Sequence, residues 1–165
     1  MSTYIQSFLI VVSSLLLLTI GCSGITPESD HPEGCVSEGY EFKNNKLIIN
    51  LSSSNQSLYL LHNISDQSFW LNHVMPTDPG ASAGWASELN IDKWSAIAMN
   101  KKKFEMNCTI IGSAEVKNLD CKEVVKVCKI KKPVFNSKDS GSFWVSENKP
   151  LSGLMDAIKN RGISL

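Results

Sequence analysis

The cysteines and histidines are the residues of this sequence that could be modified, form crosslinks or bind a metal ion. The 165 residues include five cysteines and three histidines. A cysteine can be acylated, can form a disulfide, or can bind a metal ion as its thiolate. Only Cys121 and Cys128 lie close together, no Cys-x-x-Cys pair is present, and the histidines lie far away, so we expect no metal site and no cofactor.

Cys22 follows an apolar leader. Residues 8–20 form a run of about 13 apolar and small residues, shorter than the ~20 needed to span a bilayer but suited to a secretory signal. The run ends in Leu-Thr-Ile-Gly-Cys at 18–22, which resembles a bacterial lipobox. That resemblance implies a diacylglyceryl group on the Cys22 thiol, cleavage before Cys22 and acylation of the new amine. We therefore predict a signal peptide over 1–21.

A lipidated Cys22 would hold the protein at a membrane. Each buried acyl CH2 contributes about 0.8 kcal/mol, so two or three chains, such as palmitate, make a lasting anchor. Ser23 follows the cysteine, where the lipoprotein pattern has aspartate for inner-membrane retention. We therefore expect a lipid-anchored envelope protein in the outer membrane, facing the periplasm or the surface. The alternative is an ordinary signal peptide cut near Gly21–Gly24, which leaves no anchor.

The other four cysteines are predicted to form two disulfides. Cys35, Cys108, Cys121 and Cys128 make an even number in an exported chain, which allows three connectivities. We favour Cys108–Cys121, which closes a short loop, together with Cys35–Cys128, which ties the mature N-terminus to the body of the domain.

Composition predicts one domain behind a tether. Formal net charge is zero, which argues against nucleic-acid binding. Residues 22–34 are rich in Ser, Pro, Glu and Gly and are predicted to link the lipid to the domain. Residues 35–165 are long enough to bury a core of their own.

The cysteines lie in or beside short runs of β-forming residues that are separated by turn residues. These runs predict a mainly β domain, an antiparallel β-sandwich-like fold. Phe104, Met106 and Cys108 alternate with polar residues, which points Cys108 inward. The runs lie at 46–51, 58–62, 69–74, 93–99, 104–111, 122–130 and 143–146, and 112–120 is expected to be a polar connection.

The C-terminus is predicted to be the one helix. Leu151, Leu154, Met155 and Ile158 follow the spacing of an amphipathic helix. Pro150 suits its start and Gly162 the position after its end. We expect this helix to pack on the sandwich or to cover one end of it.

The loop at 75–87 is the candidate binding loop. Its prolines and glycines disfavour regular structure, and it carries Asp78 and Trp85 close to His73. It is either a recognition loop or a crossover in which Trp85 fills the core. His62 and His73 could also face each other across a hairpin and bind a metal, but half-buried strand positions are the commoner role for such histidines.

Four Asn-x-Ser/Thr sequons provide a further alternative. They begin at Asn50, Asn55, Asn63 and Asn107 and would be used for glycosylation only in a eukaryotic secreted protein.

The chain contains five distinctive short motifs: DPGASAGWAS at 78–87, WSAIA at 94–98, FEMNC at 104–108, the Cys121-x6-Cys128 spacing and FWVSEN at 143–148. Together they resemble the enhanced entry protein EnhB family of intracellular gammaproteobacteria. The resemblance covers 35–165 and implies an envelope protein linked to entry into host cells. It brings no catalytic residues.

These observations favour a binding protein over an enzyme. The sequence contains no nucleophile elbow, phosphate-binding glycine loop or zinc signature. We expect a non-enzymatic envelope lipoprotein that acts as an interaction module, bound to the membrane by its lipid and to an envelope or host protein. The alternative is a periplasmic glycan- or lipid-binding protein or enzyme that uses Asp78, Trp85 and His73.

Overall fold

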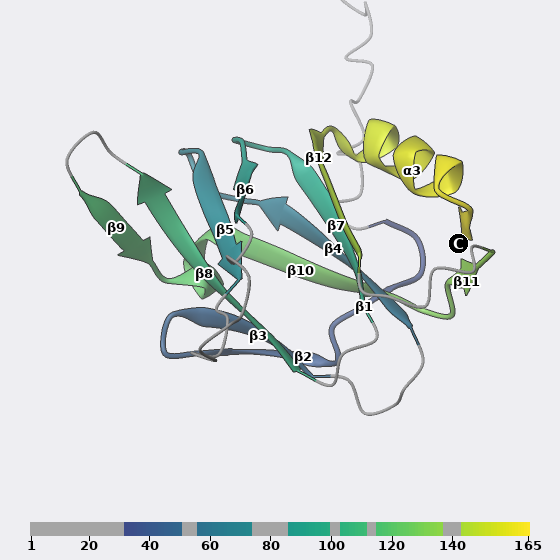
Figure 1. Cartoon of the computed structure of the whole chain (residues 1–165), viewed down its shortest axis with the longest axis horizontal. Coiled ribbons are helices and arrows are strands. Elements are labelled where there is room, and N and C mark those ends of the chain that lie inside the picture. Colours follow the sequence, from purple (N-terminus) through teal and green to yellow (C-terminus); the bar gives the residue numbers. More distant parts are fainter. Residues whose placement is uncertain (1–31, 51–55, 74–85, 100–102, 112–114, 137–142) are drawn as a thin grey trace, which may run out of the picture. The chain divides into compact units, whose positions relative to one another are not determined.

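Two antiparallel sheets make up most of the described chain (Figure 1). The computed structural model describes residues 32–50, 56–73, 86–99, 103–111, 115–136 and 143–165. Sheet A has the strand order β1 (Cys35–Val36), β10 (Val125–Ile130), β4 (Ser57–Asn63), β7 (Trp94–Met99) and β12 (Phe143–Lys149). Sheet B has the order β2 (Tyr40–Lys43), β3 (Lys46–Asn50), β8 (Lys103–Ile111), β5 (Phe69–His73) and β6 (Ala86–Leu89), and β9 (Val116–Leu119) also pairs with β8.

A hydrophobic core lies between the two sheets. Sheet B contributes alternate residues such as Leu47 and Met106, and sheet A contributes Leu61 and Val127 from its facing side. Burying a side chain of this size stabilises the fold by about 1.5–3 kcal/mol. This core confirms the predicted β-sandwich-like architecture, with Phe104, Met106 and Cys108 on its inner side.

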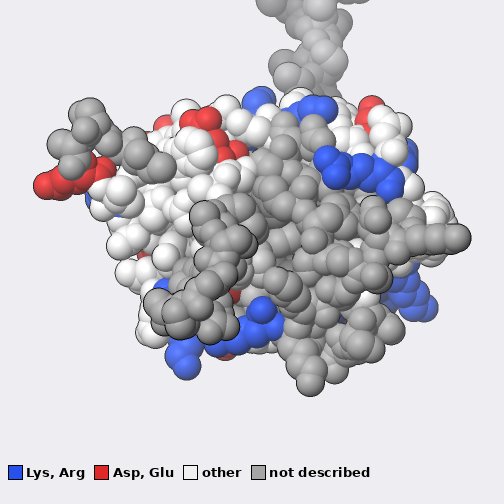
Figure 2. Space-filling model, in the orientation of Figure 1, with Lys and Arg blue, Asp and Glu red and all other residues white. Residues whose placement is uncertain are grey.

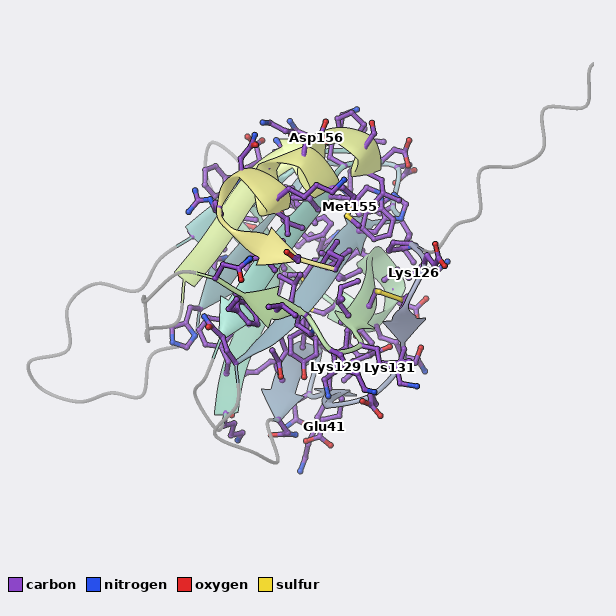
Figure 3. The ribbon with its side chains drawn as sticks, turned by 90° about the vertical axis from the view of Figure 1, so that its right-hand side faces the viewer. Glu41, Lys126, Lys129, Lys131, Met155 and Asp156 are labelled. Carbon is purple, nitrogen blue, oxygen red and sulfur yellow. A yellow bond between two sulfur atoms is a disulfide. The ribbon has the colours of Figure 1, made fainter. Side chains whose placement is uncertain are left out.

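The C-terminal helix forms a third layer on sheet A. Helix α3 (Leu151–Asn160) buries Leu154 and Ile158 against Leu58 and Leu60 of β4 and against small alanines of β7. Figure 3 shows α3 across the strands, with Asp156 pointing away from them. Gly162, with φ +79°, follows the helix, and its amide donates to the Lys159 carbonyl oxygen. The predicted helix is confirmed, and it packs on the outer face of the sandwich. A two-stranded pair, β11 (Val134–Phe135) with β13 (Ile163–Ser164), completes the strands of the described ranges.

Two elements differ from the sequence prediction around 112–130. The expected single strand at 122–130 begins as a helical turn, α2 (Cys121–Val124), before β10. Asp120 caps this turn, because its Oδ1 accepts from the Lys122 amide at 3.0 Å. The segment expected to be a polar connection contains β9. Its sequence does not alternate between apolar and polar residues, and the strand forms because it pairs with β8.

The domain also begins earlier than predicted. Pro32 is buried, its carbonyl oxygen accepts from the Cys35 amide, and the Gly34 carbonyl oxygen accepts from the Lys131 amide. Residues 32–34, assigned above to the tether, therefore contact the body of the domain. No helix in the described ranges has the length and apolar character needed to cross a bilayer.

Candidate functional site

Both disulfides predicted from the sequence are present. Cys35–Cys128 joins β1 to β10, with the two Cα atoms 5.3 Å apart. Cys108–Cys121 joins β8 to the first residue of α2, with a Cα separation of 5.4 Å. The first disulfide packs on the side of sheet A that α3 covers, and the second lies in the core between the sheets. One disulfide thus lies within sheet A, and the other lies in the core between the sheets.

The predicted binding loop is described only at its edge. Cys22, Asp78 and Trp85 lie outside the described residues. His73 is at the end of β5, where its ring stacks on Phe104 with centroids 4.0 Å apart. Its Nδ1 lies 3.0 Å from the Glu105 carbonyl oxygen, which can only accept, so Nδ1 carries the proton. His73 is thereby fixed against sheet B.

His62 and His73 do not face each other across a hairpin, which was the less favoured alternative, and both are half-buried strand residues as expected. β4 pairs with β7 and β10 in sheet A, whereas β5 pairs with β6 and β8 in sheet B. The two histidines therefore belong to different sheets rather than to one hairpin. Within the described ranges, no group of three or more His, Cys, Asp or Glu side chains could hold a metal ion.

His62 instead belongs to a small cluster on sheet A. Its ring stacks on Trp94 at 4.2 Å, and its Nε2 lies 2.9 Å from Asp92 Oδ1. This histidine–carboxylate pair is the arrangement of a general base. Ser95 follows Trp94 in β7 and points to the other face of the sheet, so His62 cannot activate its hydroxyl.

Asn63, one of the four sequon asparagines, has a structural role. Its side chain is buried, and its Nδ2 donates to the carbonyl oxygens of Gln67 and Leu89 at 2.9 and 3.0 Å. Its Oδ1 accepts from the Ser65 amide. The nitrogen that N-glycosylation would modify is thus used to hold the turn after β4, which argues against the glycoprotein alternative at this site.

Sheet B has a notch where two strands share one edge of β8. β3 pairs with Lys103–Asn107, and β9 pairs with Cys108–Ile111. Both strands lie on the same edge, because β5 occupies the other edge opposite Cys108 and Thr109. The edge partner of β8 therefore changes between Asn107 and Cys108.

A cavity of about 200 Å³ occupies this notch. Side chains of the β2–β3 turn, of β8 and of β9 surround it. The lining residues are Asn44, Asn45, Lys46, Asn107, Cys108, Asn118 and Leu119. The polar side chains around the cavity are thus four asparagines and one lysine, whereas Cys108 is fully buried.

Lys46 shares one carboxylate with Lys103 next to the cavity. Lys46 Nζ lies 3.5 Å from Glu105 Oε2, and Lys103 Nζ lies 2.6 Å from Oε1 of the same carboxylate. The hydrogen bond from Lys103 is the main cause that lowers the pKa of Glu105, and the charges of both lysines add to it against the effect of burial. Glu105 is therefore an anion beside Lys46 at neutral pH.

Charges of both signs are spread over the face shown in Figure 2. Acidic side chains gather over the upper ends of β5 and β6 and near β9, and basic side chains gather over α3 and the β2–β3 hairpin. This distribution agrees with the formal net charge of zero.

Comparison of the chain with protein-family models, with curated proteins and with solved structures gave no match. The resemblance to the EnhB family therefore stays a prediction. Within the described ranges, a small, partly open cavity lies beside β8, and the sequence analysis did not indicate it.

Proposed function

We propose that this chain is an envelope lipoprotein, anchored through Cys22, that presents a disulfide-bonded β-sandwich as a non-enzymatic interaction module. Its partner would be another envelope protein or a host protein. The resemblance to the EnhB family supports a role in entry into host cells.

The single observation that carries the proposal is the position of the Cys35–Cys128 disulfide. β1 contains only two residues and would separate easily from β10 if the chain before it were pulled. The disulfide fastens Cys35 covalently to an inner strand of sheet A. Such a fastening would keep β1 in sheet A when tension acts on an N-terminal tether.

The length of the tether also suits an anchored module. Cys22 and Pro32, the first residue held at the domain, are 10 residues apart in the sequence, so the chain between them reaches about 35 Å at most, at ~3.5 Å per residue. The module would stay near the membrane surface while it samples partners within that distance.

The side chains favour binding over catalysis. The His62–Asp92 pair has Ser95 on the wrong face of its strand, and the imidazole of His73 is held by Phe104 and the Glu105 carbonyl oxygen. The alternative of an enzyme or lipid-binding protein acting through Asp78, Trp85 and His73 receives less support for this reason.

The anchor is tested with the full chain and its Cys22→Ala variant. Cells are labelled with a fatty acid, their membranes are fractionated, and the intact mass of the product is measured. We expect label, membrane association and cleavage before Cys22 in the wild type, and loss of all three in the variant. Ser23→Ala, which keeps the thiol, should remain labelled. An unlabelled wild type cut elsewhere would refute the anchor.

The interaction module is tested by crosslinking in intact envelopes. A photoreactive side chain at exposed Lys43 reports on the sandwich, and one at exposed Lys159 reports on α3. We expect specific crosslinked partners in the anchored wild type that decline in the Cys22→Ala variant. Recovery of only abundant background proteins from both positions would contradict the proposal.

A further inference from the structure

We propose that the free edge of β2 pairs antiparallel with the same edge of a second copy of this chain, so that the two copies of sheet B join into one continuous sheet around a two-fold axis. This inference goes beyond the proposed interaction module, and it requires neither the lipid anchor nor a partner of another kind.

The turn between β2 and β3 fixes which backbone groups of β2 are used within the chain. Both turn residues have positive φ, 52° and 63°, and a two-residue turn of this kind is flanked by a hydrogen-bonded pair, here Lys43 with Lys46. At the other end of the hairpin, the Asn50 amide donates to the Gly39 carbonyl oxygen at 2.9 Å. The odd-numbered residues of β2 therefore point their N–H and C=O groups toward β3.

The even-numbered residues of β2, Tyr40 and Phe42, point their N–H and C=O groups to the other side, because hydrogen-bonded and non-bonded pairs alternate along an antiparallel ladder. Within the part of the chain that the structure describes, these groups have no hydrogen-bond partner. Figure 1 shows β2 along the lower rim of sheet B, and Figure 3 shows Glu41 at the lower rim of the molecule. An edge of this kind is a template on which another strand can pair.

The charges of β2 fit a second copy of β2. Glu41 and Lys43 are exposed on the outer face of sheet B, since the residues between them pack against the core. A two-fold axis through the Phe42 pair places Glu41 opposite Lys43 of the second copy, and the symmetry repeats this pair. Opposite charges directly across two strands attract, and like charges repel. An axis at Glu41 or at Lys43 would oppose two like charges, so the charge pattern favours one register over its two neighbours.

The aromatic side chains of β2 fit the same register. The rings of Tyr40 and Phe42 are half-buried at the rim of the core and meet edge to face, with centroids 5.8 Å apart. An axis through the Phe42 pair brings the two Phe42 side chains together, with Cβ atoms about 4.5–5.5 Å apart, which covers part of their exposed surface. The contact uses the same edge of both copies, so it closes at a dimer and does not extend into a filament.

The size of the contact sets its expected strength. β2 has four residues, and a ladder of this length buries less than the ~1,200 Å² of a stable interface. We therefore expect a dimer that dissociates readily and whose population rises with the protein concentration.

Amide hydrogen exchange tests the use of the edge directly. The purified full chain is followed by NMR from micromolar to millimolar concentration. We expect exchange of the Phe42 amide to slow as the concentration rises, because this group is bonded only in the dimer. The Lys43 amide, which pairs with Lys46 in each copy, serves as the internal control and should not respond. Exchange at Phe42 that is independent of concentration would overturn the inference.

Charge reversal tests the register. Glu41→Lys and Lys43→Glu each oppose like charges and should weaken association about tenfold, as measured by sedimentation equilibrium. The double variant exchanges the two charges and should associate like the wild type, and an equimolar mixture of the two single variants should form a mixed dimer. Glu88→Lys, the matched reversal at an exposed position of β6, should leave association unchanged.

Every variant carries the same residues 1–34, so a difference between variants reports on β2, and urea denaturation verifies that each is folded. Single variants that associate as tightly as the wild type would contradict the register. A folded double variant that fails to recover association, or a mixture that forms no mixed dimer, would contradict it equally. Crosslinks from Lys159 on α3 to other proteins do not involve β2, so failure of this inference and failure of the proposed interaction module are distinguishable.

Discussion

The outer faces of the two sheets have opposite characters. On sheet A, the face turned away from sheet B is apolar and is covered by α3, with Leu58, Leu60 and Ile158 in contact. On sheet B, the corresponding face carries polar side chains, among them Asn72 and Thr109, which hydrogen-bond to each other. Sheet A is thus a central layer, and the outer face of sheet B carries polar side chains.

The sequences of the strands differ in the same way as the two outer faces. β4 reads Ser-Leu-Tyr-Leu-Leu-His-Asn and buries residues on both faces, whereas β8 buries every second residue over most of its described length. A strand covered on both sides needs a continuous apolar run, and a strand covered on one side alternates. Stability should therefore reside around sheet A, and binding specificity on sheet B.

The largest expected effect comes from the disulfide that fastens sheet A. Replacing Cys35 and Cys128 by alanine reopens a loop of 93 residues, which lowers the free energy of unfolding by about 4.5 kcal/mol through the entropy of the unfolded chain. Replacing Cys108 and Cys121, which are 13 residues apart, should cost about 3 kcal/mol. Urea denaturation of both double variants measures this. A larger loss from the second pair would show that sheet B, rather than sheet A, controls stability.

The second prediction compares the two faces directly. Leu154→Ala removes a fully buried side chain between α3 and sheet A and should cost about 2–5 kcal/mol. Asn118→Ala on exposed β9 should change the free energy of unfolding by less than about 0.5 kcal/mol. Thermal and urea unfolding of the two variants provide the measurement. Similar losses from both would remove the distinction between a structural face and a binding face.

The smallest effect concerns a contact at the rim of the core between the sheets. Tyr59 Oη donates to the Gly39 carbonyl oxygen at 3.1 Å. Burial, with a smaller contribution from the charge of Glu38, raises the pKa of Tyr59 from 10.0 to about 12. Between pH 10.0 and about 12, the folded protein therefore keeps the Tyr59 proton, whereas the unfolded chain loses it. The contribution of Tyr59 to the free energy of unfolding is complete below pH 10.0 and is lost as the pH rises through about 12.

Tyr59→Phe isolates this contribution. The variant should be about 1 kcal/mol less stable at neutral pH, because the Gly39 carbonyl oxygen loses its donor. The difference from the wild type should shrink and then change sign as the pH rises from 10 to 12, while the other titrating groups act equally on both proteins. A difference that stays constant up to pH 12 would contradict the assigned role of burial at Tyr59.

Sequence patterns predicted the strands that have strong burial signals. Alternation identified β8 and the inward side of Cys108, the apolar runs identified β4 and β7, and i, i+3, i+4, i+7 spacing identified α3. Six strands were missed, and each of them pairs along one side only: β1, β2, β6, β9, β11 and β13. β6 begins at Ala86, inside the segment 75–87 that was predicted to lack regular structure. The order of apolar and polar residues along a segment says little about a strand that forms only because it pairs with a neighbouring strand.

The candidate site was predicted less well than the fold. Residues 78 and 85, chosen for their loop chemistry, lie outside the described ranges, and His73 proved to be fixed in sheet B. The cavity was missed because Asn45, Asn107 and Asn118 come from three separate segments, each ordinary by itself. Its existence depends on where β3 ends and β9 begins along β8.

The sequence by itself determined the properties that short-range periodicity and residue counts can encode. These are the mainly β class, the terminal amphipathic helix, and two disulfides with the favoured pairing of Cys35 with Cys128. Tertiary structure alone decided which face of the sandwich α3 covers, that His62 and His73 belong to different sheets, and that four asparagines surround one cavity. The physical reason is that each of these depends on strand order and register, which are contacts between segments far apart in the chain.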